Sequence, residues 1–476
     1  MRIKTFYFIL ISTLLFSCAK NPVTGKRQVV FTSEKGERQM GVTADPQIVA
    51  SFGLYENATL QNYINNRGNE MAKISHRPNL EYEFKIVDSP VVNAFAVPGG
   101  FVYFTRGIMA HFNNEAEFSG VLGHELGHIT ARHSVIQQRN AILGQIGLIG
   151  SMIAVPELAQ FAEPVTQGMG LLMLKFGRDA ESQSDKLGVE YSSRIGYDAE
   201  EMAGFFNTLA RKQEEAGVSI PEFLSTHPNP INRKANVSAM AKEWQSELNL
   251  NNAKVGRDSY LAMIEGLVYG EDPRQGFVEA NSFYHPTLKF FFKIPPAWQT
   301  QNSPQQFQMA PEDGKALMFL TLAEGSDLQA ATAKSLEQFQ MTAISSKNNI
   351  INGFQAVEVL AQQVQEQMTI KAKLTFIKYE NNIYQIVGLS RDVDFNALAS
   401  KFSYCMSSFK KLTDPEKLNR KPERLHIVSV KSNGTFSKAL KDHGVTDERL
   451  EELSILNGFM LNDQVKQGVK MKVTIK

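Results

Sequence analysis

Residues 114–133 read NEAEFSGVLGHELGHITARH, and this stretch decides the fold of the N-terminal half of the chain. Asn114 is followed three residues later by Glu117, which is a capping-box signature for the start of a helix. No proline interrupts the residues that follow. The stretch therefore predicts a helix that begins near Glu115.

This helix contains the motif HELGH. His124 and His128 are four residues apart, so both imidazoles leave one helix face and can occupy two corners of a tetrahedron around one metal ion. Glu125 projects about 100° away around the helix axis, where it can hold a metal-bound water without being a ligand. His133 points in another direction and is not expected to be a ligand. The spacing is typical of a zinc hydrolase; the alternative is a helix with two solvated histidines that flank an acid.

A hydrolytic zinc ion needs three protein ligands and one open position for water. Residues 177–188 read GRDAESQSDKLG and predict a second helix, on which Glu181 and Asp185 are one turn apart. Glu181 would complete a His2Glu site for one zinc ion per chain. Asp185 would accept the free ring N–H of a ligating histidine. A surface helix with spaced acids is the alternative.

Three more motifs accompany these two helices, namely NAFAVPGG at residues 93–100, YFTRG at residues 103–107 and STHPNPINR at residues 225–233. Together with HELGH and the Glu-x-x-x-Asp of the second helix, they resemble peptidase family M48. That family includes the CAAX prenyl endopeptidases, the HtpX membrane proteases and the Oma-type proteases. The resemblance covers about residues 21–250 and implies a zincin-like fold with Glu181 as the third zinc ligand.

The resemblance also implies an edge strand beside the cleft, at residues 93–97. An extended substrate can add to such a strand through main-chain hydrogen bonds, which hold a peptide bond over the zinc with little side-chain selectivity. A plain core strand is the alternative. The expected substrate-binding residues are Asn93, Ala94, Phe95 and Ala96.

Two residues after the second helix complete the site implied by the family. The corresponding histidine of the family faces the zinc, so His227 would donate to the tetrahedral oxyanion or, in a latent enzyme, occupy the open zinc position. The latent alternative predicts that His227→Ala raises activity. Arg233 would pair with a carboxylate, bind the substrate backbone or form a purely structural salt bridge.

The first 18 residues predict a lipoprotein signal peptide. Arg2 and Lys4 precede an apolar run at residues 6–16, which is too short to span a bilayer. The run ends in Leu-Phe-Ser-Cys, which resembles the lipobox of bacterial lipoproteins and makes Cys18 the lipidation site. Cleavage elsewhere, with a free thiol at Cys18, is the alternative.

The chain has only two cysteines, so a lipid on Cys18 leaves no partner for an internal disulfide. Cys405 lies on an apolar stripe with helical spacing. We therefore predict that it is a core residue and not a nucleophile. The other members of the stripe are Phe395, Leu398, Phe402 and Phe409.

The 476 residues are enough for two or three domains, and 43% hydrophobic with 21% charged residues indicates a folded protein. We expect an α+β protein whose mostly helical metallopeptidase domain spans residues 21–265. An antiparallel sheet with helices on one face is expected at residues 276–412, as a substrate-recruiting or regulatory module or as a passive spacer. The apolar run at residues 141–155 is interpreted as a lid over the cleft, with membrane dipping as the alternative.

Residues 424–476 predict a β-α-α-β unit that resembles a LysM module. Such modules bind glycans that contain N-acetylglucosamine, such as peptidoglycan. The resemblance leaves open whether this unit shares only the fold or also binds glycan.

These features favour a zinc-dependent endopeptidase that hydrolyses misfolded or unassembled cell-envelope proteins, with Glu125 as general base for a zinc-activated water. Lipid on Cys18 would hold it at the periplasmic face of a bacterial membrane, the outer membrane in preference to the inner. Nucleic acid is not expected as a partner, since 50 basic against 49 acidic residues leave a net charge of +1. The alternative from another class is a non-proteolytic envelope chaperone or a peptidoglycan-binding scaffold.

Overall fold

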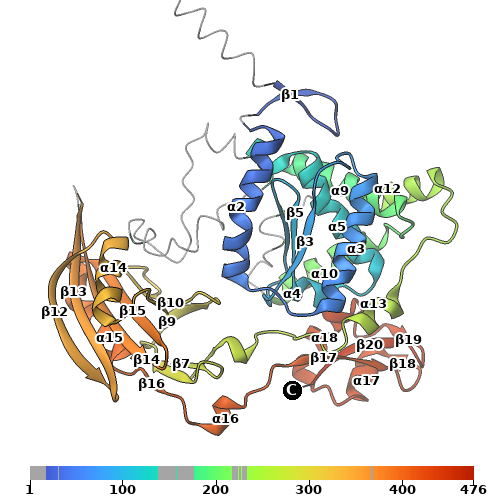
Figure 1. Cartoon of the computed structure of the whole chain (residues 1–476). Helices are drawn as coiled ribbons and strands as arrows, with labels where there is room; N and C mark the ends of the chain where they lie inside the picture. The colour runs from blue at the N-terminus through green and yellow to red at the C-terminus, as the bar shows by residue number, and fades with distance from the viewer. Residues whose placement is uncertain are drawn as a thin grey trace, which may run out of the picture.

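The computed structural model describes residues 18–30, 32–137, 158, 176–216, 223, 227, 233–365 and 368–475. The chain comprises an N-terminal unit (residues 18–265), a sheet unit (residues 276–412) and a C-terminal unit (residues 424–475). Figure 1 shows the C-terminal unit, in red, directly beside the N-terminal unit, while the sheet unit, in yellow and orange, lies to one side. Helices and antiparallel sheets occur together, which confirms the predicted α+β class.

The N-terminal unit is mostly helical and contains one three-stranded sheet. Its strands are β3 (Glu83–Val87), β4 (Ala94–Val97) and β5 (Phe101–Thr105), in the order β3-β5-β4. Strand β4 is antiparallel to β5 and has no second neighbour among the described strands, so it is the expected edge strand. The other elements are β1 (Cys18–Lys20), β2 (Arg27–Val29), α2 (Glu34–Phe52), α3 (Ala58–Ile74), α4 (Arg106–His111), α5 (Glu115–Thr130), α9 (Arg178–Arg194), α10 (Glu201–Ala216), α12 (Arg233–Glu247) and α13 (Arg257–Met263).

Helix α5 begins where the sequence predicts. The Asn114 side chain accepts a hydrogen bond of 2.7 Å from the backbone N–H of Glu117, and the Glu117 carboxylate accepts one of 2.6 Å from the backbone of Asn113. Every residue of α5 is buried. The helix therefore passes through the centre of the N-terminal unit, and its polar residues need partners inside the protein.

Helices α5 and α9 touch along their backbones. A Cβ atom added to Gly123 of α5 would lie 2.9 Å from the Cα atom of Gly188 on α9, closer than real Cβ contacts. Two glycines thus face each other where the helices cross, and any larger residue would push the helices apart. This close approach brings the first turn of α9, with Glu181, to the HELGH face of α5.

The sheet unit contains a seven-stranded antiparallel sheet in the order β12-β13-β14-β15-β11-β10-β9 and a four-stranded sheet in the order β16-β8-β7-β6. Two longer helices accompany them, α14 (Leu328–Gln338) and α15 (Asp392–Met406). The strands are β6 (Phe277–Glu279), β7 (Ser282–His285), β8 (Phe290–Lys293), β9 (Trp298–Asn302), β10 (Gln306–Pro311), β11 (Ala316–Leu322), β12 (Thr342–Ile351), β13 (Phe354–Gln365), β14 (Met368–Tyr379), β15 (Asn382–Arg391) and β16 (Lys410–Lys411).

The prediction that helices cover one face of this sheet is wrong. Helix α14 packs in the apolar cluster that contains Phe319 of β11, whereas α15 packs in the cluster that contains the neighbouring Met318. Successive residues of a strand point to opposite faces, so the helices cover opposite faces. On the face covered by α15, Lys373 of β14 donates a hydrogen bond of 2.7 Å to Ser403 of that helix.

Cys405 is a core residue, as predicted. Its side chain is completely buried on α15, in the same cluster as Phe402 and Phe409. Burial raises the pKa of the Cys405 thiol well above its usual value, so the reactive thiolate form is suppressed.

The apolar run at residues 141–155 lies outside the described residues. Leu158, which follows it, is buried in the same cluster as α14 and Phe319. The chain between α5 and α9 therefore reaches the sheet unit at this residue. Among the described helices, none has both the length and the apolar character required to cross a membrane.

The C-terminal unit has the predicted strand, two helices and final strand, with the additional two-residue strands β18 and β19 on either side of the helices. It consists of β17 (Arg424–Ser429), β18 (Gly434–Thr435), α17 (Phe436–Lys441), α18 (Leu450–Asn457), β19 (Gln464–Val465) and β20 (Lys470–Ile475), and it follows the short helix α16 (Pro415–Leu418). Strands β17 and β20 pair antiparallel. Apolar residues of this unit share one cluster with the core of the N-terminal unit, including Leu456 and Val473 beside Phe112 and Phe205. The two units thus form one continuous core.

Lys472 of β20 anchors the C-terminal unit next to the start of α5. Its side chain is fully buried, and its ammonium group donates to the carbonyl oxygens of Ala110 at 2.9 Å and Phe112 at 3.1 Å. Burial lowers the pKa of Lys472 well below its usual value, while the nearby Glu117 opposes this shift. The apolar methylene chain of Lys472 thus lies in the shared core, while its ammonium group reaches backbone carbonyls of the N-terminal unit.

We expect Lys472→Met to lower the free energy of unfolding by about 2–4 kcal/mol, since it leaves two buried carbonyls without a donor. Urea unfolding followed by circular dichroism measures the change. Lys470→Met is the matched control on the same strand, because the side chain of Lys470 is 38% exposed and is paired only at the surface. Equal effects of both substitutions would contradict the anchoring role.

Candidate active site

Four buried side chains from three parts of the N-terminal unit converge on one point. Helix α5 supplies His124 and His128, α9 supplies Glu181, and His227 lies between α10 and α12 in the chain. One nitrogen or oxygen atom from each lies within 4.8 Å of the corresponding atoms of the other three. All four side chains are at most 1% exposed. The two histidines of HELGH and the acid some fifty residues later therefore meet as the sequence predicts.

The distances between the imidazole nitrogens and the carboxylate oxygens suit coordination of one shared metal ion. The Nε2 atoms of His124 and His128 are 3.0 Å apart. The Glu181 carboxylate lies 3.6 Å from His124 Nε2 and 3.5 Å from His128 Nε2. Each imidazole thus presents the same ring nitrogen to the carboxylate, with its other nitrogen directed outward.

A divalent cation fits this group of residues. Within the part of the chain that the structure describes, neither carboxylate oxygen of Glu181 has a hydrogen-bond partner. Burial raises the pKa of Glu181 and lowers the pKa of His128, because the charged form of each group is poorly solvated there. A cation would compensate the carboxylate and accept both imidazole lone pairs. Two histidines and one carboxylate are a ligand set typical of catalytic zinc.

Asp185 and Arg233 lie beside the Nδ1 atom of His124. The Nδ1 atom of His124 lies 3.0 Å from Asp185 Oδ1. Arg233 donates to both oxygens of Asp185, at 2.7 and 2.6 Å, and its guanidinium lies 4.1 Å from the centre of the Phe206 ring. Burial alone would raise the pKa of Asp185, but Arg233 and His124 hold it below its usual value. The ionised Asp185 therefore orients the imidazole with Nε2 toward the metal position.

Arg233 also reaches the ligand set directly. Its Nη2 atom lies 3.4 Å from Glu181 Oε2, and the side chain is only 2% exposed. Of the roles left open for Arg233 by the sequence, the structure displays a buried ion pair with carboxylates. One cation thus neutralises two acids of α9.

His128 has a partner that the sequence did not suggest. Its Nδ1 atom lies 3.1 Å from Nδ1 of His133, whose Nε2 atom is 3.0 Å from the Gln183 side-chain oxygen. His133 does not belong to the group that can share one metal ion. Helix α5 ends at Thr130, and Arg132 has a positive φ of 62°, so the chain turns back toward His128. Helical spacing cannot predict a contact that arises after the helix has ended.

Glu125 lies beside the ligand set and is fully buried. Neither of its carboxylate oxygens has a hydrogen-bond partner among the described residues, and Oε1 is 3.6 Å from His227 Nε2. Burial raises the pKa of the Glu125 carboxyl to about 8, against the opposing charge of Arg233. A carboxylate in such surroundings accepts a proton readily, which is the property a general base requires.

The start of strand β4 is tied to the segment that carries His227. The backbone N–H of Phe223 donates to the carbonyl of Val92 at 3.2 Å, and the N–H of His227 donates to the carbonyl of Phe223 at 2.8 Å. Asn93 is bonded to Thr105 of β5 through its backbone. Ala94 and Ala96 face the inner core, while Phe95 packs with α2 on the other face. Substrate binding by these residues stays a prediction, and so does lipid on Cys18, which begins β1.

The arrangement of the site agrees with the relatives that the sequence matches, which are proteases by name. The chain is 30% identical to the Beta-barrel assembly-enhancing protease of Escherichia coli O157:H7 over 239 residues, which is 48% of each protein. It is 30% identical to the Mitochondrial metalloendopeptidase OMA1 of Arabidopsis thaliana over 194 residues, covering 40% of this chain and 38% of the relative.

A third relative is the Metalloprotease YcaL of Escherichia coli K12, with 29% identity over 163 residues, 32% of this chain and 60% of the relative. The chain thus spans about half or less of the length of the first relatives it matches. Residues 58–241 match the model of Peptidase family M48, and this range contains α5, α9 and all four residues of the metal-competent group. Residues 58–241 are therefore a domain of peptidase family M48.

Proposed function

We propose that the chain is a zinc-dependent endopeptidase that cleaves misfolded or unassembled polypeptides of the bacterial cell envelope. The observation that carries this proposal is the convergence of His124, His128 and Glu181, whose buried donor atoms fit one divalent cation. The relatives named as proteases support the same reaction class. The name of the first relative refers to β-barrel assembly, which supports envelope proteins as substrates.

In this proposal the metal ion would activate the attacking water, and Glu125 transfers its proton. Zinc held by His124, His128 and Glu181 would act as a Lewis acid and lower the pKa of a coordinated water toward about 7. Glu125 accepts the proton of the attacking water on its carboxylate and returns it to the nitrogen of the leaving amine. Because Glu125 is fully buried, bulk water does not compete for this carboxylate.

Chelation tests the metal requirement. The purified protein should contain one zinc ion per chain and cleave casein, and 1,10-phenanthroline should abolish cleavage because the water then lacks its Lewis acid. Metal analysis by mass spectrometry and a gel-based cleavage assay measure both quantities, and added zinc should restore activity. Undiminished cleavage by the metal-free protein would contradict the proposal. Tight binding of unfolded casein without cleavage would favour the chaperone or scaffold alternative.

The hydrogen bonding of His227 favours a resting state in which this residue closes the site. Its Nδ1 atom lies 3.2 Å from the carbonyl oxygen of Phe223, and a carbonyl only accepts, so Nδ1 carries the proton. Neutral His227 then directs the lone pair of Nε2, not a donor, toward the ligand set. A lone pair at this position suits a fourth metal ligand and not an oxyanion donor.

We therefore expect His227→Ala to raise the basal rate of peptide cleavage severalfold, since it opens the fourth coordination position for water. Initial rates on a fluorogenic peptide, normalised to zinc content, measure this change. A fall in kcat of about 10²-fold would show instead that His227 stabilises the transition state. His443→Ala, in the C-terminal unit and outside the group that can share a metal ion, serves as the control.

Location and further partners complete the proposal. Lipid on Cys18 would hold the protein at the periplasmic face of a membrane, and the outer membrane is preferred to the inner membrane. The β-α-α-β order of the C-terminal unit supports a LysM-like fold, and peptidoglycan is its proposed partner.

A further inference from the structure

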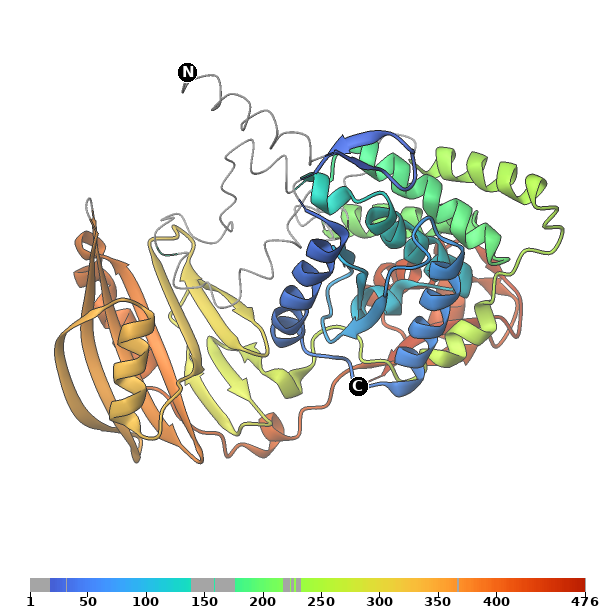
Figure 2. The same ribbon diagram turned by 45° about the horizontal axis from the view of Figure 1, so that its top comes forward.

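A large cavity lies where the N-terminal unit meets the sheet unit. Its volume is about 1080 Å³, and its walls come from both units and from the segment that connects them. This volume is at the upper limit of the roughly 300–1,000 Å³ found for small-molecule sites. Figures 1 and 2 show α2 on the side of the N-terminal unit that faces the sheet unit, and the residues after α2 line the cavity.

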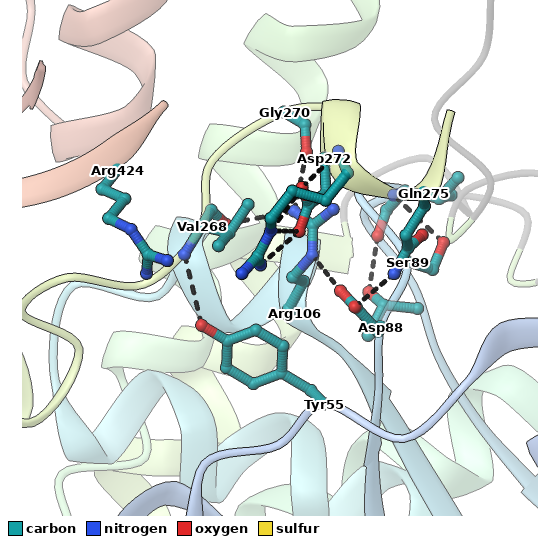
Figure 3. A network of polar contacts seen from close by, with 12 residues as sticks. Tyr55, Asp88, Ser89, Arg106, Val268, Gly270, Asp272, Gln275 and Arg424 are labelled. Carbon is teal, nitrogen blue, oxygen red and sulfur yellow. Dashed lines mark hydrogen bonds and ion pairs between the residues drawn. The ribbon is translucent and has the colours of Figure 1, made fainter. Parts of the chain in front are cut away.

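A rigid polar network forms the floor of the cavity. Arg106, which is 1% exposed, donates to Asp88 at 2.5 Å and to the carbonyls of Val268 at 3.1 Å and Gly270 at 2.7 Å. Gln275 donates to the other oxygen of Asp88 at 2.5 Å. Figure 3 shows these residues meeting around the Arg106 guanidinium. The connecting segment is thus bound to the N-terminal unit, and together they form one wall of the cavity.

The walls expose apolar side chains from three separate segments. Leu54 follows α2 and is 47% exposed, Leu288 lies between β7 and β8 and is 37% exposed, and Leu322 ends β11 and is 55% exposed. Phe307 and Phe319 line the same space. Isolated exposed leucines are common, but several that converge on one cavity indicate a site for an apolar ligand.

The polar groups of the cavity suit a ligand without strong net charge. Asp88 is paired with Arg106, and Asp272 is paired with Arg274 at 2.5 Å, so both carboxylates already have a counter-charge. Gln306 is 8% exposed, and its Nε2 donor has no hydrogen-bond partner among the described residues. A buried donor of this kind is complementary to a carbonyl oxygen. Apolar side chains on a backbone with free carbonyls are the chemistry of an unfolded polypeptide.

The cavity lies within reach of the candidate substrate strand. Asp88 of the floor precedes Asn93 by five residues, so their Cα atoms are at most about 18 Å apart. A substrate chain that extends along β4 and past Asn93 therefore needs about five more residues to reach the floor.

We infer that this cavity binds an apolar stretch of the polypeptide substrate, about five to ten residues from the bond that is cleaved. The inference rests on the proposed function and adds its substrate class: chains long enough to occupy β4 and the cavity together, with aliphatic or aromatic residues exposed. The sheet unit then contributes to affinity for long substrates and not to the chemical step.

The test is a comparison of substrates of two lengths. The triple variant Leu54→Ser, Leu288→Ser and Leu322→Ser is expected to raise KM for reduced, carboxymethylated α-lactalbumin about tenfold. Its kcat should not change, and neither should the kinetics on a peptide of about four residues, which is too short to reach from the cleaved bond to the cavity. The control triple variant carries serine at apolar residues of the sheet unit that are exposed outside the cavity, namely Ile350, Val364 and Val393.

A second measurement separates this inference from the proposed function. Fluorescein-labelled carboxymethylated α-lactalbumin is bound to the full-length Glu125→Gln variant, with and without the three serine substitutions, and followed by anisotropy. Weakening by about tenfold supports the cavity whether or not the wild type cleaves anything. Unchanged binding and unchanged KM for the long substrate would overturn the inference, while failure of the wild type to cleave either substrate would overturn the proposed function instead.

Discussion

The variant Glu125→Gln is expected to lower kcat for peptide hydrolysis by about 10³-fold while zinc content stays at one ion per chain. Gln has nearly the shape of Glu but cannot accept a proton, so the water loses its base. The ligands His124, His128 and Glu181 are unchanged and continue to hold the metal. Initial rates and metal analysis of the same preparation measure both effects.

The control for this prediction is a second Glu→Gln change outside the site. Glu190 lies on α9 and pairs with Arg194 at 3.0 Å near the surface. Glu190→Gln should retain full activity. Two results would contradict the role of Glu125: undiminished cleavage by Glu125→Gln, or a loss of zinc in parallel with activity, which would make Glu125 a structural or ligating residue.

The second large effect is expected for Arg233→Met. We expect zinc affinity to fall by about 10–100-fold and the free energy of unfolding to fall by about 3–5 kcal/mol. Asp185 is 4% exposed, and without Arg233 its buried charge has no cation beside it. Protonation of Asp185 would then relieve the charge, and His124 would lose the ionised partner that orients its ring.

Competition with a zinc-chelating dye measures the affinity, and urea unfolding measures the stability. The double variant Asp185→Asn with Arg233→Met should recover part of the lost stability, because no buried charge then lacks a partner. Arg194→Met is the matched control, since the Arg194 side chain is 41% exposed and forms a surface pair. A single variant Arg233→Met with unchanged zinc affinity would contradict the orienting role.

Much of the candidate site follows from short-range patterns. The capping residue Asn114 determines where α5 begins, and a spacing of four then places His124 and His128 on one face whatever the rest of the chain does. The spacing of Glu181 and Asp185 works in the same way on α9. These residues could be predicted because, in a helix, the number of residues between two side chains determines whether they lie on the same face.

Contacts between elements could not be predicted in this way. His133 meets His128 only because Arg132 adopts a left-handed conformation after α5 has ended. Helix α15 covers the lysine-bearing face of the sheet because its apolar side chains share a core cluster with that face, and Lys373 finds a hydrogen-bond partner at its margin. Alternation along a strand identifies two faces but does not say which of them another element will cover.

The sequence by itself determined three of the residues that meet in the candidate site, namely two imidazoles and a carboxylate on two helices of the part that matches peptidase family M48, and it identified Cys405 as a core residue. Only the tertiary structure decided how the units combine. Lys472 joins the C-terminal unit to the core beside α5, and Arg106 binds the connecting segment, which lines a cavity together with the sheet unit. Local spacing is encoded within one element, whereas packing depends on surfaces that distant parts of the chain present to one another.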